Sequence, residues 1–365
     1  MRLAVPIMFG LVSIILFNVV DTFYIGMLGA EPLAAVSFTF PVVYVVMSVA
    51  FGLGIGTSAV IAHAIGEGDE HRVRRLTTDG LTLTLGVVLS IALAGLLSIE
   101  PLFRALGAST RLLPLIRDYM GIWYGGIGLL VIPIIGNSAI RATGDTKTPS
   151  IVMMTAGGVN ALLDPFLIFG IGPFPRMELS GAALSTVASY TIAFAAAFWM
   201  LARREGMIDF SIPRFPAMLR SWEEILHIGL PAAGTNVLVP LSNGILTRIV
   251  SGFGAPAVAA FGVGQRVESL SMIGLMALSS VLTPFVGQNW GAGKRVRVRQ
   301  GISASIRFSL YWGGGGFLLL ALLADPIARV FTNDPAVAAL IVAYLRIVPV
   351  SYGFFGIILV TNAAF

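Results

Sequence analysis

The stretch Gly157-Gly158-Val159-Asn160-Ala161-Leu162-Leu163-Asp164-Pro165 lies inside a long apolar segment, roughly residues 149–172. Asn160 and Asp164 are four residues apart, so on a helix they share one face, one turn above the other. An aspartate inside a membrane-length segment costs about 2.5–3.5 kcal/mol on insertion scales unless a partner or water meets it. Pro165 removes a backbone donor and frees the carbonyl of Ala161, beside Asn160. The stretch therefore predicts a membrane helix that carries a functional carboxylate.

The composition indicates a polytopic membrane protein. Of 365 residues, 56% are hydrophobic and 11% are charged, whereas a soluble domain carries about 25% charged residues. There is no cysteine, and His63, His71 and His227 have no metal-ligand spacing. With no nucleophile–base set in view either, we expect no enzyme and no cofactor. The net charge of +5 indicates cytoplasmic loops and not nucleic-acid binding.

Apolar windows of about 20 residues predict an all-α polytopic protein with ten spans. The predicted spans are 3–27, 33–62, 80–99, 116–139, 148–172, 180–202, 224–251, 257–286, 302–324 and 337–362. Basic residues gather in alternate loops, after the even-numbered spans: Arg72, Arg74, Arg75, Arg141, Lys147, Arg203, Arg204, Arg214, Arg220, Lys294, Arg295, Arg297 and Arg299. The opposite loops hold Arg104, Arg111, Arg176 and Arg329. This asymmetry predicts a multi-pass protein of the cell (inner or plasma) membrane with a cytoplasmic N-terminus.

The sequence repeats without gaps at a spacing of 225 residues. The coinciding pairs include Pro6 and Pro231, Asn18 and Asn243, Gly29 and Gly254, Gly66 and Gly291, Gly68 and Gly293, and Tyr119 and Tyr344. The repeat predicts two six-helix lobes related by an axis along the membrane normal. The predicted divisions are an N-terminal lobe (1–203), a cytoplasmic linker (204–223) and a C-terminal lobe (224–365). Since the second lobe then holds four spans, we expect a fragment or a shortened chain of a twelve-span protein, with a natural ten-span form as the alternative.

Candidate ion-binding residues stand where the repeat breaks its own symmetry. Asp21 in the first span has Leu246 as its counterpart, and Asn18 lies one turn before Asp21. Together, Asp21, Asn160, Asp164 and a hydroxyl such as that of Thr186 would supply hard oxygen ligands, which suit an alkali cation or a proton. Two nearby carboxylates in a low dielectric cannot easily both ionise without a counter-ion.

Each acidic residue also has a structural interpretation. Asp21 would then lie at the wetted outer end of its span, and Asp164 would pair with Arg248 or Arg346. Glu268 is a possible second carboxylate in the C-terminal lobe, with a local pair to Arg266 or Arg248 as the alternative.

Three stretches resemble the multidrug and toxic compound extrusion (MATE) transporters. They are Pro6–Gly29, which contains Asn18-Val19-Val20-Asp21; Arg141-Ala142-Thr143-Gly144-Asp145-Thr146-Lys147-Thr148-Pro149; and Asn160–Pro165 followed by Gly181–Thr186. The resemblance implies two lobes around a central cavity that opens alternately to either side. It implies an antiporter that exports organic, often cationic and amphipathic, compounds in exchange for Na⁺ or H⁺.

Within this family the likeness is to the DinF-like branch, whose cation site lies in the N-terminal lobe. Its aspartates match Asp21 and Asp164, its asparagine matches Asn160, and its threonine matches Thr186. The span-seven glutamate of another branch falls at Val239, so that site is absent here.

Several choices stay open at this point. The same carboxylates can bind Na⁺ or H⁺, and no other metal is expected. A lipid-linked oligosaccharide flippase of the same superfamily is the alternative function, and it predicts basic residues in the cavity, for which Arg248, Arg266 and Arg346 are candidates. A membrane scaffold would leave the intramembrane aspartates unexplained. The expected partners are small organic substrates and the lipid bilayer, without nucleic acid, and the protein is expected to be a monomer.

Overall fold

Long helices run from end to end of the molecule and reverse direction at short loops. The computed structural model describes residues 3–211, 215–332 and 334–364, and all regular elements in those ranges are helical. The α-helices are α1 (Ala4–Leu28), α2 (Ala30–Glu67), α3 (Glu70–Ala105), α4 (Leu113–Gly125), α5 (Ile127–Ala142), α6 (Lys147–Phe169), α7 (Glu178–Trp199), α8 (Phe215–Ser251), α9 (Ala255–Gly291), α10 (Arg295–Phe331), α11 (Pro335–Ile347) and α12 (Tyr352–Ala364). A π-helical turn, Met200–Arg204, follows α7, and a 3₁₀ turn, Val348–Ser351, joins α11 to α12.

The ten predicted spans are confirmed, with two differences in shape. Within the described residues nine helical segments are long and apolar enough to cross a membrane, and α4 with α5 forms a tenth span bent by 48°. The sequence predicted one unbroken helix over 116–139, but Gly126 interrupts it. Several helices also extend beyond the predicted spans: α3 occupies Glu70–Ala105 where 80–99 was predicted, because an apolar window misses amphipathic helix ends.

The outer surfaces fit a lipid environment. Large apolar side chains stand fully outward on several helices, among them Leu97 (79% exposed), Leu322 (78%) and Val330 (82%). A water-soluble monomer rarely exposes such extensive apolar surface. Together with the ten spans, these faces identify a multi-pass membrane protein.

The repeat is visible in the turns. Gly29 between α1 and α2 has φ +122°, and its repeat partner Gly254 between α8 and α9 has φ +95°. Gly68 at the end of α2 has φ +79°, and its partner Gly293 has φ +69°. L-residues with a side chain rarely adopt these angles. The shared glycines therefore give both halves the same reversals of direction.

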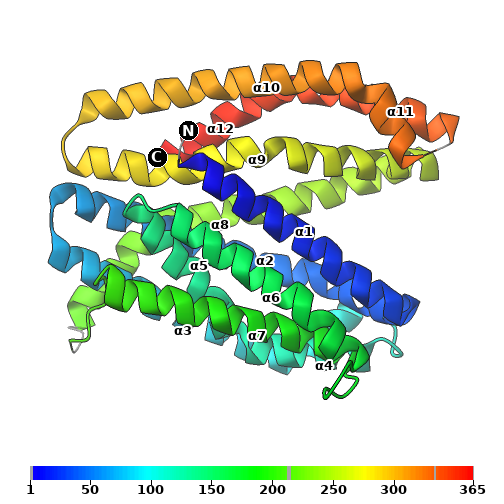
Figure 1. Ribbon diagram of the computed structural model, residues 1–365, viewed down its shortest axis with the longest axis horizontal. Helices are drawn as coiled ribbons and strands as arrows, with labels where there is room; N and C mark the ends of the chain where they lie inside the picture. Colours follow the sequence, from blue (N-terminus) through cyan, green and yellow to red (C-terminus); the bar gives the residue numbers. More distant parts are fainter. Residues whose placement is uncertain (1–2, 212–214, 333, 365) are drawn as a thin grey trace.

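Figure 1 shows how the two halves are arranged. Helices α3–α7 lie on one side, α9–α12 lie on the other, and α1, α2 and α8 lie between them. The turns α2–α3 and α9–α10 lie at the same end of the molecule. We call this end the basic end, because the predicted clusters of Arg and Lys belong to its loops; Arg214, one of that set, lies outside the described residues.

At the basic end, α2 and α9 approach to backbone contact. A Cβ atom added to Gly66 would collide with the carbonyl oxygen of Gln288, and one added to Gly291 would collide with the carbonyl oxygen of His63. His63 and Gln288 are themselves repeat partners, so the two collisions are the same contact seen from each half. Between them, a Cβ on Gly287 would lie 2.8 Å from the Cβ of Ala62. The crossing is therefore self-complementary, like a two-fold interface between identical subunits.

Polar bonds reinforce the crossing. Gln288 Nε2 donates to the carbonyl of Ala142 on α5 at 2.6 Å. Arg72 on α3 bonds to Glu67 on α2 at 2.6 Å and to Glu224 on α8 at 2.8 Å. The bonds of Gln288 to Ala142 and of Arg72 to Glu224 tie the first half to the second at the basic end.

Helix α8 is buried near the basic end and exposed toward the opposite end. The described buried residues of α8 are Ser221, Ile225, Gly229 and Ala233, all in its first half. Further along, Leu238, Leu241 and Ile249 are each 58% exposed. The described part of α8 is thus packed along its first half and exposed along its second half.

The stretch Arg141–Pro149, which carried part of the family likeness, forms the turn between α5 and α6. The carboxylate of Asp145 accepts hydrogen bonds from the Thr148 amide at 3.0 Å and from the Thr148 hydroxyl at 2.5 Å, and lies 3.3 Å from Arg204 Nη2. Burial by itself would raise the pKa of Asp145, but the bonds from Thr148 and the charge of Arg204 outweigh it and lower the pKa below its ordinary value of 3.8. This turn stabilises the fold and holds no candidate ligand.

We expect Gly66→Ala and Gly291→Ala each to destabilise the protein by about 1–3 kcal/mol, because the added methyl group overpacks the α2–α9 crossing. Since both variants damage one contact, the double variant should lose less than the sum of the two. Thermal unfolding midpoints of the purified protein would measure this. Gly86→Ala and Gly262→Ala are the matched controls, because their helical sites face open space, and they should be neutral or stabilising by up to about 1 kcal/mol. Equal unfolding midpoints for Gly66→Ala and Gly86→Ala would contradict the close α2–α9 contact at Gly66.

Asp145→Asn should lower the unfolding midpoint at pH 7 by the equivalent of about 1 kcal/mol, as for loss of a helix-capping carboxylate. The depressed pKa means that ionised Asp145 stabilises the fold above pH 3.8, and that this contribution disappears as the pH falls through the lowered value. The midpoints of variant and wild type should therefore converge as the pH is lowered below about 4. Asp118→Asn, at an exposed position, should show no such convergence.

Candidate functional site

The candidate site begins with the register between α1 and α6. Gly10 packs against Ser150, with 3.5 Å from its added Cβ to Ser150 Cβ, and the ring of Phe17 occupies the space where a Cβ of Gly157 would be. Both contacts have the same offset, so the two helices run parallel in one register. Continued by one turn, this register sets Asp21 at the level of the Asn160–Asp164 face.

The second wall comes from α7, which runs antiparallel to α6. A Cβ on Gly181 would lie 2.5 Å from the carbonyl oxygen of Leu167. This close approach brings the next turn of α7, with Ser185 and Thr186, against Asn160 and Asp164.

A hydrogen-bond network joins these side chains. Asn160 Nδ2 lies 3.0 Å from Ser185 Oγ, 3.3 Å from Asp164 Oδ1 and 3.4 Å from Thr186 Oγ1. The Ser185 hydroxyl also donates to Asp164 Oδ1, and the Thr186 hydroxyl donates to the carbonyl of Ala182 at 3.0 Å. Asp164 is fully buried and Asn160 is 5% exposed. The network therefore fixes one oxygen of Asp164 and leaves the other free.

Two carboxylate oxygens in this site lack partners. Asp21 Oδ1 and Asp164 Oδ2 are buried without a hydrogen bond, and the two carboxylates lie within electrostatic range of each other. Neither forms an ion pair within residues 3–211, 215–332 and 334–364. Of the arginines considered for Asp164, Arg346 is bound to Asp325 at 2.7 Å and Arg248 is exposed. A buried acceptor without a partner costs about 1–3 kcal/mol, and more if it is charged.

Two further side chains join the site that the sequence did not assign to it. The hydroxyl of Tyr119 on α4 lies within electrostatic range of Asp21 and Asp164, and the residue is 8% exposed. Ser185 lies one position before the predicted Thr186 and makes the more direct contact with Asp164. The sequence feature that could have pointed to Tyr119 is its recurrence as Tyr344 in the repeat.

Two predicted residues lie elsewhere. Asn18 is exposed, and its carbonyl accepts a bond from the Thr22 hydroxyl at 2.6 Å. Glu268 lies on α9 in the second half, where it accepts a 2.7 Å hydrogen bond from Tyr344 and forms no ion pair with Arg266 or Arg248 in the described part of the chain. The structure thus gathers Asp21, Asn160, Asp164 and Thr186, and separates Asn18 and Glu268 from them.

The donor set suits a hard, small ion. The site offers carboxylate, amide and hydroxyl oxygens, which are ligands for alkali cations or acceptors for protons. Among the described residues no group of three His, Cys, Asp or Glu side chains comes together. The arrangement therefore fits the binding of Na⁺ or H⁺ and lacks the ligands of a transition-metal site.

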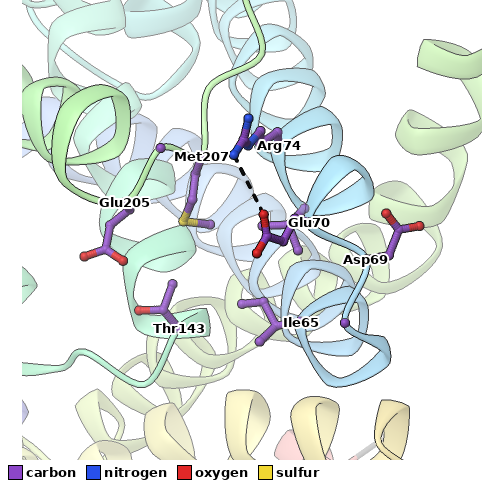
Figure 2. Close-up of a pocket in the computed structure, with 10 residues that line it drawn as sticks. Ile65, Asp69, Glu70, Arg74, Thr143, Glu205 and Met207 are labelled. Carbon is purple, nitrogen blue, oxygen red and sulfur yellow. Dashed lines mark ion pairs between the residues drawn. The ribbon is translucent and has the colours of Figure 1, made fainter.

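A separate hollow of about 390 Å³ lies at the basic end, away from the carboxylates. Figure 2 shows its lining, in which Glu70 and Arg74 face each other at 3.8 Å. Glu70 is 89% exposed, so this pair is solvated and worth little energetically. The hollow is a surface feature of the basic end and does not enclose the candidate site.

Comparisons with known proteins agree with this geometry. The MatE family model matches residues 6–166 and again residues 231–365, which is the same repeat register found in the sequence. A protein of Shewanella oneidensis named FAD transporter is 40% identical over 364 residues, covering 100% of this chain and 80% of that protein. The probable multidrug resistance protein NorM of Thermotoga maritima is 30% identical over 350 residues, covering 92% of this chain and 72% of that protein.

The fold agrees as well. The crystal structure of the Vibrio cholerae MATE transporter VcmN in the bent form superposes with a TM-score of 0.92 at 30% identity, covering 100% of this chain and 82% of that one. The family model matches both halves, and the relatives and the structure named above are 30–40% identical to this chain. Together these matches show the family, whose members are transporters and not enzymes. The chain belongs to the MatE family of membrane transporters.

Proposed function

We propose that the protein is an ion-coupled exporter, in which Na⁺ or H⁺ binds between Asp21 and Asp164 and drives an organic solute in the opposite direction. The observation that carries the proposal is the convergence of two buried carboxylate oxygens that no cation of the described protein neutralises. In a low dielectric such a pair needs a proton or a bound cation. Asn160 and Thr186 are the proposed further ligands.

Ion binding changes the charge at the contact between α1 and the α6–α7 pair. The buried residues of α1 are Ala4, Ile7, Gly10 and Ile25, so most side chains of this helix are not buried against the rest of the protein. We expect α1 to be the element that repacks when the site loads and unloads. A ligand shifts a conformational equilibrium only by binding one state more tightly than the other, and the displacement of α1 relative to Asp164 supplies that difference.

In this proposal the basic end faces the cytoplasm, following the asymmetry of basic residues. The crossing of α2 with α9 then closes the cytoplasmic side, and the described conformation corresponds to an outward-facing state. The exposed second half of α8 supports the same orientation of the opening.

The relatives narrow the solute class. The protein named FAD transporter is 40% identical, whereas relatives with multidrug names are 30% identical or less. Both groups fit an amphipathic aromatic solute, so FAD and a cationic dye are the first two compounds to test. For the flippase alternative, Arg346 is already paired with Asp325, so Arg248 and Arg266 are the remaining candidates to meet a lipid phosphate, and the two phosphates of FAD would need the same residues.

The experiment that tests the function uses purified protein in proteoliposomes loaded with FAD or dye, under an imposed Na⁺ gradient or an imposed pH gradient. One of the two gradients should accelerate solute movement, and Asp21→Asn or Asp164→Asn should reduce that acceleration at least tenfold, because each removes a charge that the ion neutralises. Asp118→Asn is the matched control, since Asp118 is exposed on α4, and it should transport normally. Gradient-driven transport that survives in both site variants would refute the proposed site.

Ser185→Ala should strengthen proton binding at Asp164 without abolishing transport. The Ser185 hydroxyl donates to the ionised carboxylate and favours the charged form. A hydrogen bond to a charged acceptor is worth about 1.5–3 kcal/mol, so for a proton the concentration at half-maximal rate should fall about tenfold or more. Ser189→Ala is the control, because its buried hydroxyl one turn further along α7 donates to the Ser185 carbonyl. If both variants change the half-maximal concentration equally, Ser185 has no special role toward the ion.

A further inference from the structure

The two turns that the repeat relates at the basic end differ in charge. Three acidic residues lie at the α2–α3 turn: Glu67, Asp69 and Glu70. Their repeat partners at the α9–α10 turn are one neutral residue and two cations: Ala292, Lys294 and Arg295. No Asp or Glu occurs in residues 269–324. The α9–α10 turn is therefore a cationic surface whose own segment supplies no acid.

The difference is clearest at one arginine position. Arg72 in the first half is bound to the carboxylates of Glu67 at 2.6 Å and of Glu224 at 2.8 Å. Its repeat partner Arg297 forms no ion pair within residues 3–211, 215–332 and 334–364, and the position of Glu67 is taken by Ala292. A guanidinium group can bind two acceptor oxygens side by side. Arg297 thus has donors that the described part of the protein does not use.

Arg297 lines a hollow of about 430 Å³ where α2 meets α9. Both halves contribute to its wall, which includes Ile65, Gly66, Gln288, Asn289, Lys294 and Arg297. The amides of Gln288 and Asn289 already donate to the carbonyls of Ala142 at 2.6 Å and of Phe285 at 2.8 Å. Among the described side chains of this wall, the uncommitted charged donors are therefore those of Lys294 and Arg297.

Membrane topology alone does not account for these unpaired cations. An excess of Lys and Arg marks a cytoplasmic loop whether or not the residues are paired. The α2–α3 turn lies at the same end and pairs its arginines, Arg72 with Glu67 and Arg74 with Glu70. Two like charges that line one hollow repel each other, and a bound anion would remove that repulsion.

We propose that this hollow binds a phosphate group, with Arg297 and Lys294 as its charged ligands. The guanidinium of Arg297 would hold two phosphate oxygens, and the ammonium of Lys294 would act as a point charge toward another. A group in this hollow touches α2 at Gly66 as well as α9 and α10, so its binding stabilises the α2–α9 crossing. Only an effect of the phosphate on transport rests on the proposed function; its binding does not.

The position of the hollow along α10 favours a water-borne phosphate over a lipid head group. Residues 308–324 of α10 carry no charged side chain and span roughly 25 Å, close to a hydrocarbon thickness of about 30 Å. Arg297 precedes them by 11 residues, which is roughly 16 Å. The head-group layer adds only about 5–8 Å on each side. The hollow therefore opens in the aqueous phase, where inorganic phosphate or a nucleotide can reach it.

Calorimetric titration of the purified full chain in detergent, with inorganic phosphate and with ATP, tests the proposal. Arg297→Gln should weaken binding about tenfold or more, because a charge-assisted hydrogen-bond pair is lost. Ala292→Glu should also weaken it while keeping both cations, because it places a carboxylate where Glu67 meets Arg72 in the first half. Arg299→Gln is the matched control, since it removes an exposed charge of the same turn that does not line the hollow, and it should leave the affinity nearly unchanged.

Nanodiscs with and without phosphatidylglycerol separate the two sources of phosphate. If neither inorganic phosphate nor ATP binds in detergent, but phosphatidylglycerol raises the unfolding midpoint of the wild type and not of Arg297→Gln, the group belongs to a lipid and the water-borne source is wrong. If phosphatidylglycerol makes no such difference either, or if Arg299→Gln weakens binding as much as Arg297→Gln, the hollow is not a phosphate site. These measurements use no ion gradient, so their outcome is independent of coupling at Asp21 and Asp164.

Discussion

The backbone contact between α2 and α9 at the basic end is the constraint on which the arrangement of the two halves depends. Gly66 faces the Gln288 carbonyl and Gly291 faces the His63 carbonyl, so each half presents the same surface to the other. Such a crossing is self-complementary, so a duplicated sequence forms it from one surface that occurs twice and needs no second kind of surface. Because the contact lies at one end of two helices of 38 and 37 residues, it holds the two halves together at that end.

The carboxylate site depends on the same kind of close approach, now inside one half. Phe17 over Gly157 sets the register of α1 against α6, and Gly181 against the Leu167 carbonyl sets α7 against α6. These two registers bring Asp21, Ser185 and Asp164 to one level. The network satisfies only one oxygen of Asp164. Incomplete satisfaction of a buried charge is unfavourable for a purely structural site, but it is what an ion-exchanging site requires, because a fully bonded carboxylate would have no vacancy for the ion.

Much of the fold followed from the sequence, because apolar length and the repeat are both linear properties. The spans were recognisable from windows of hydropathy, and the repeat register agrees with the two MatE matches at 6–166 and 231–365. The spacing of Asn160 and Asp164 also gave the correct helix face. Ser185 could not be chosen over Thr186, because that choice depends on the rotation of α7 against α6. The bend at Gly126 was likewise hidden, since residues 119–136 carry no charged side chain and hydropathy does not report a change in helix direction.

The same tyrosine position lies near different carboxylates in the two halves, and this bears on how a duplicated transporter becomes asymmetric. The repeat fixes Tyr119 and Tyr344 at equivalent points of the bent span, α4 in one half and α11 in the other. Asp21 has Leu246 as its counterpart, and Glu268 has Val43, so each half carries an acid where the other is apolar. A buried phenol tolerates an acidic neighbour from either side because its hydroxyl donates to whichever oxygen approaches. The tyrosine is therefore the conserved part of the architecture, and the position of the acid is the variable part that makes the two halves chemically different.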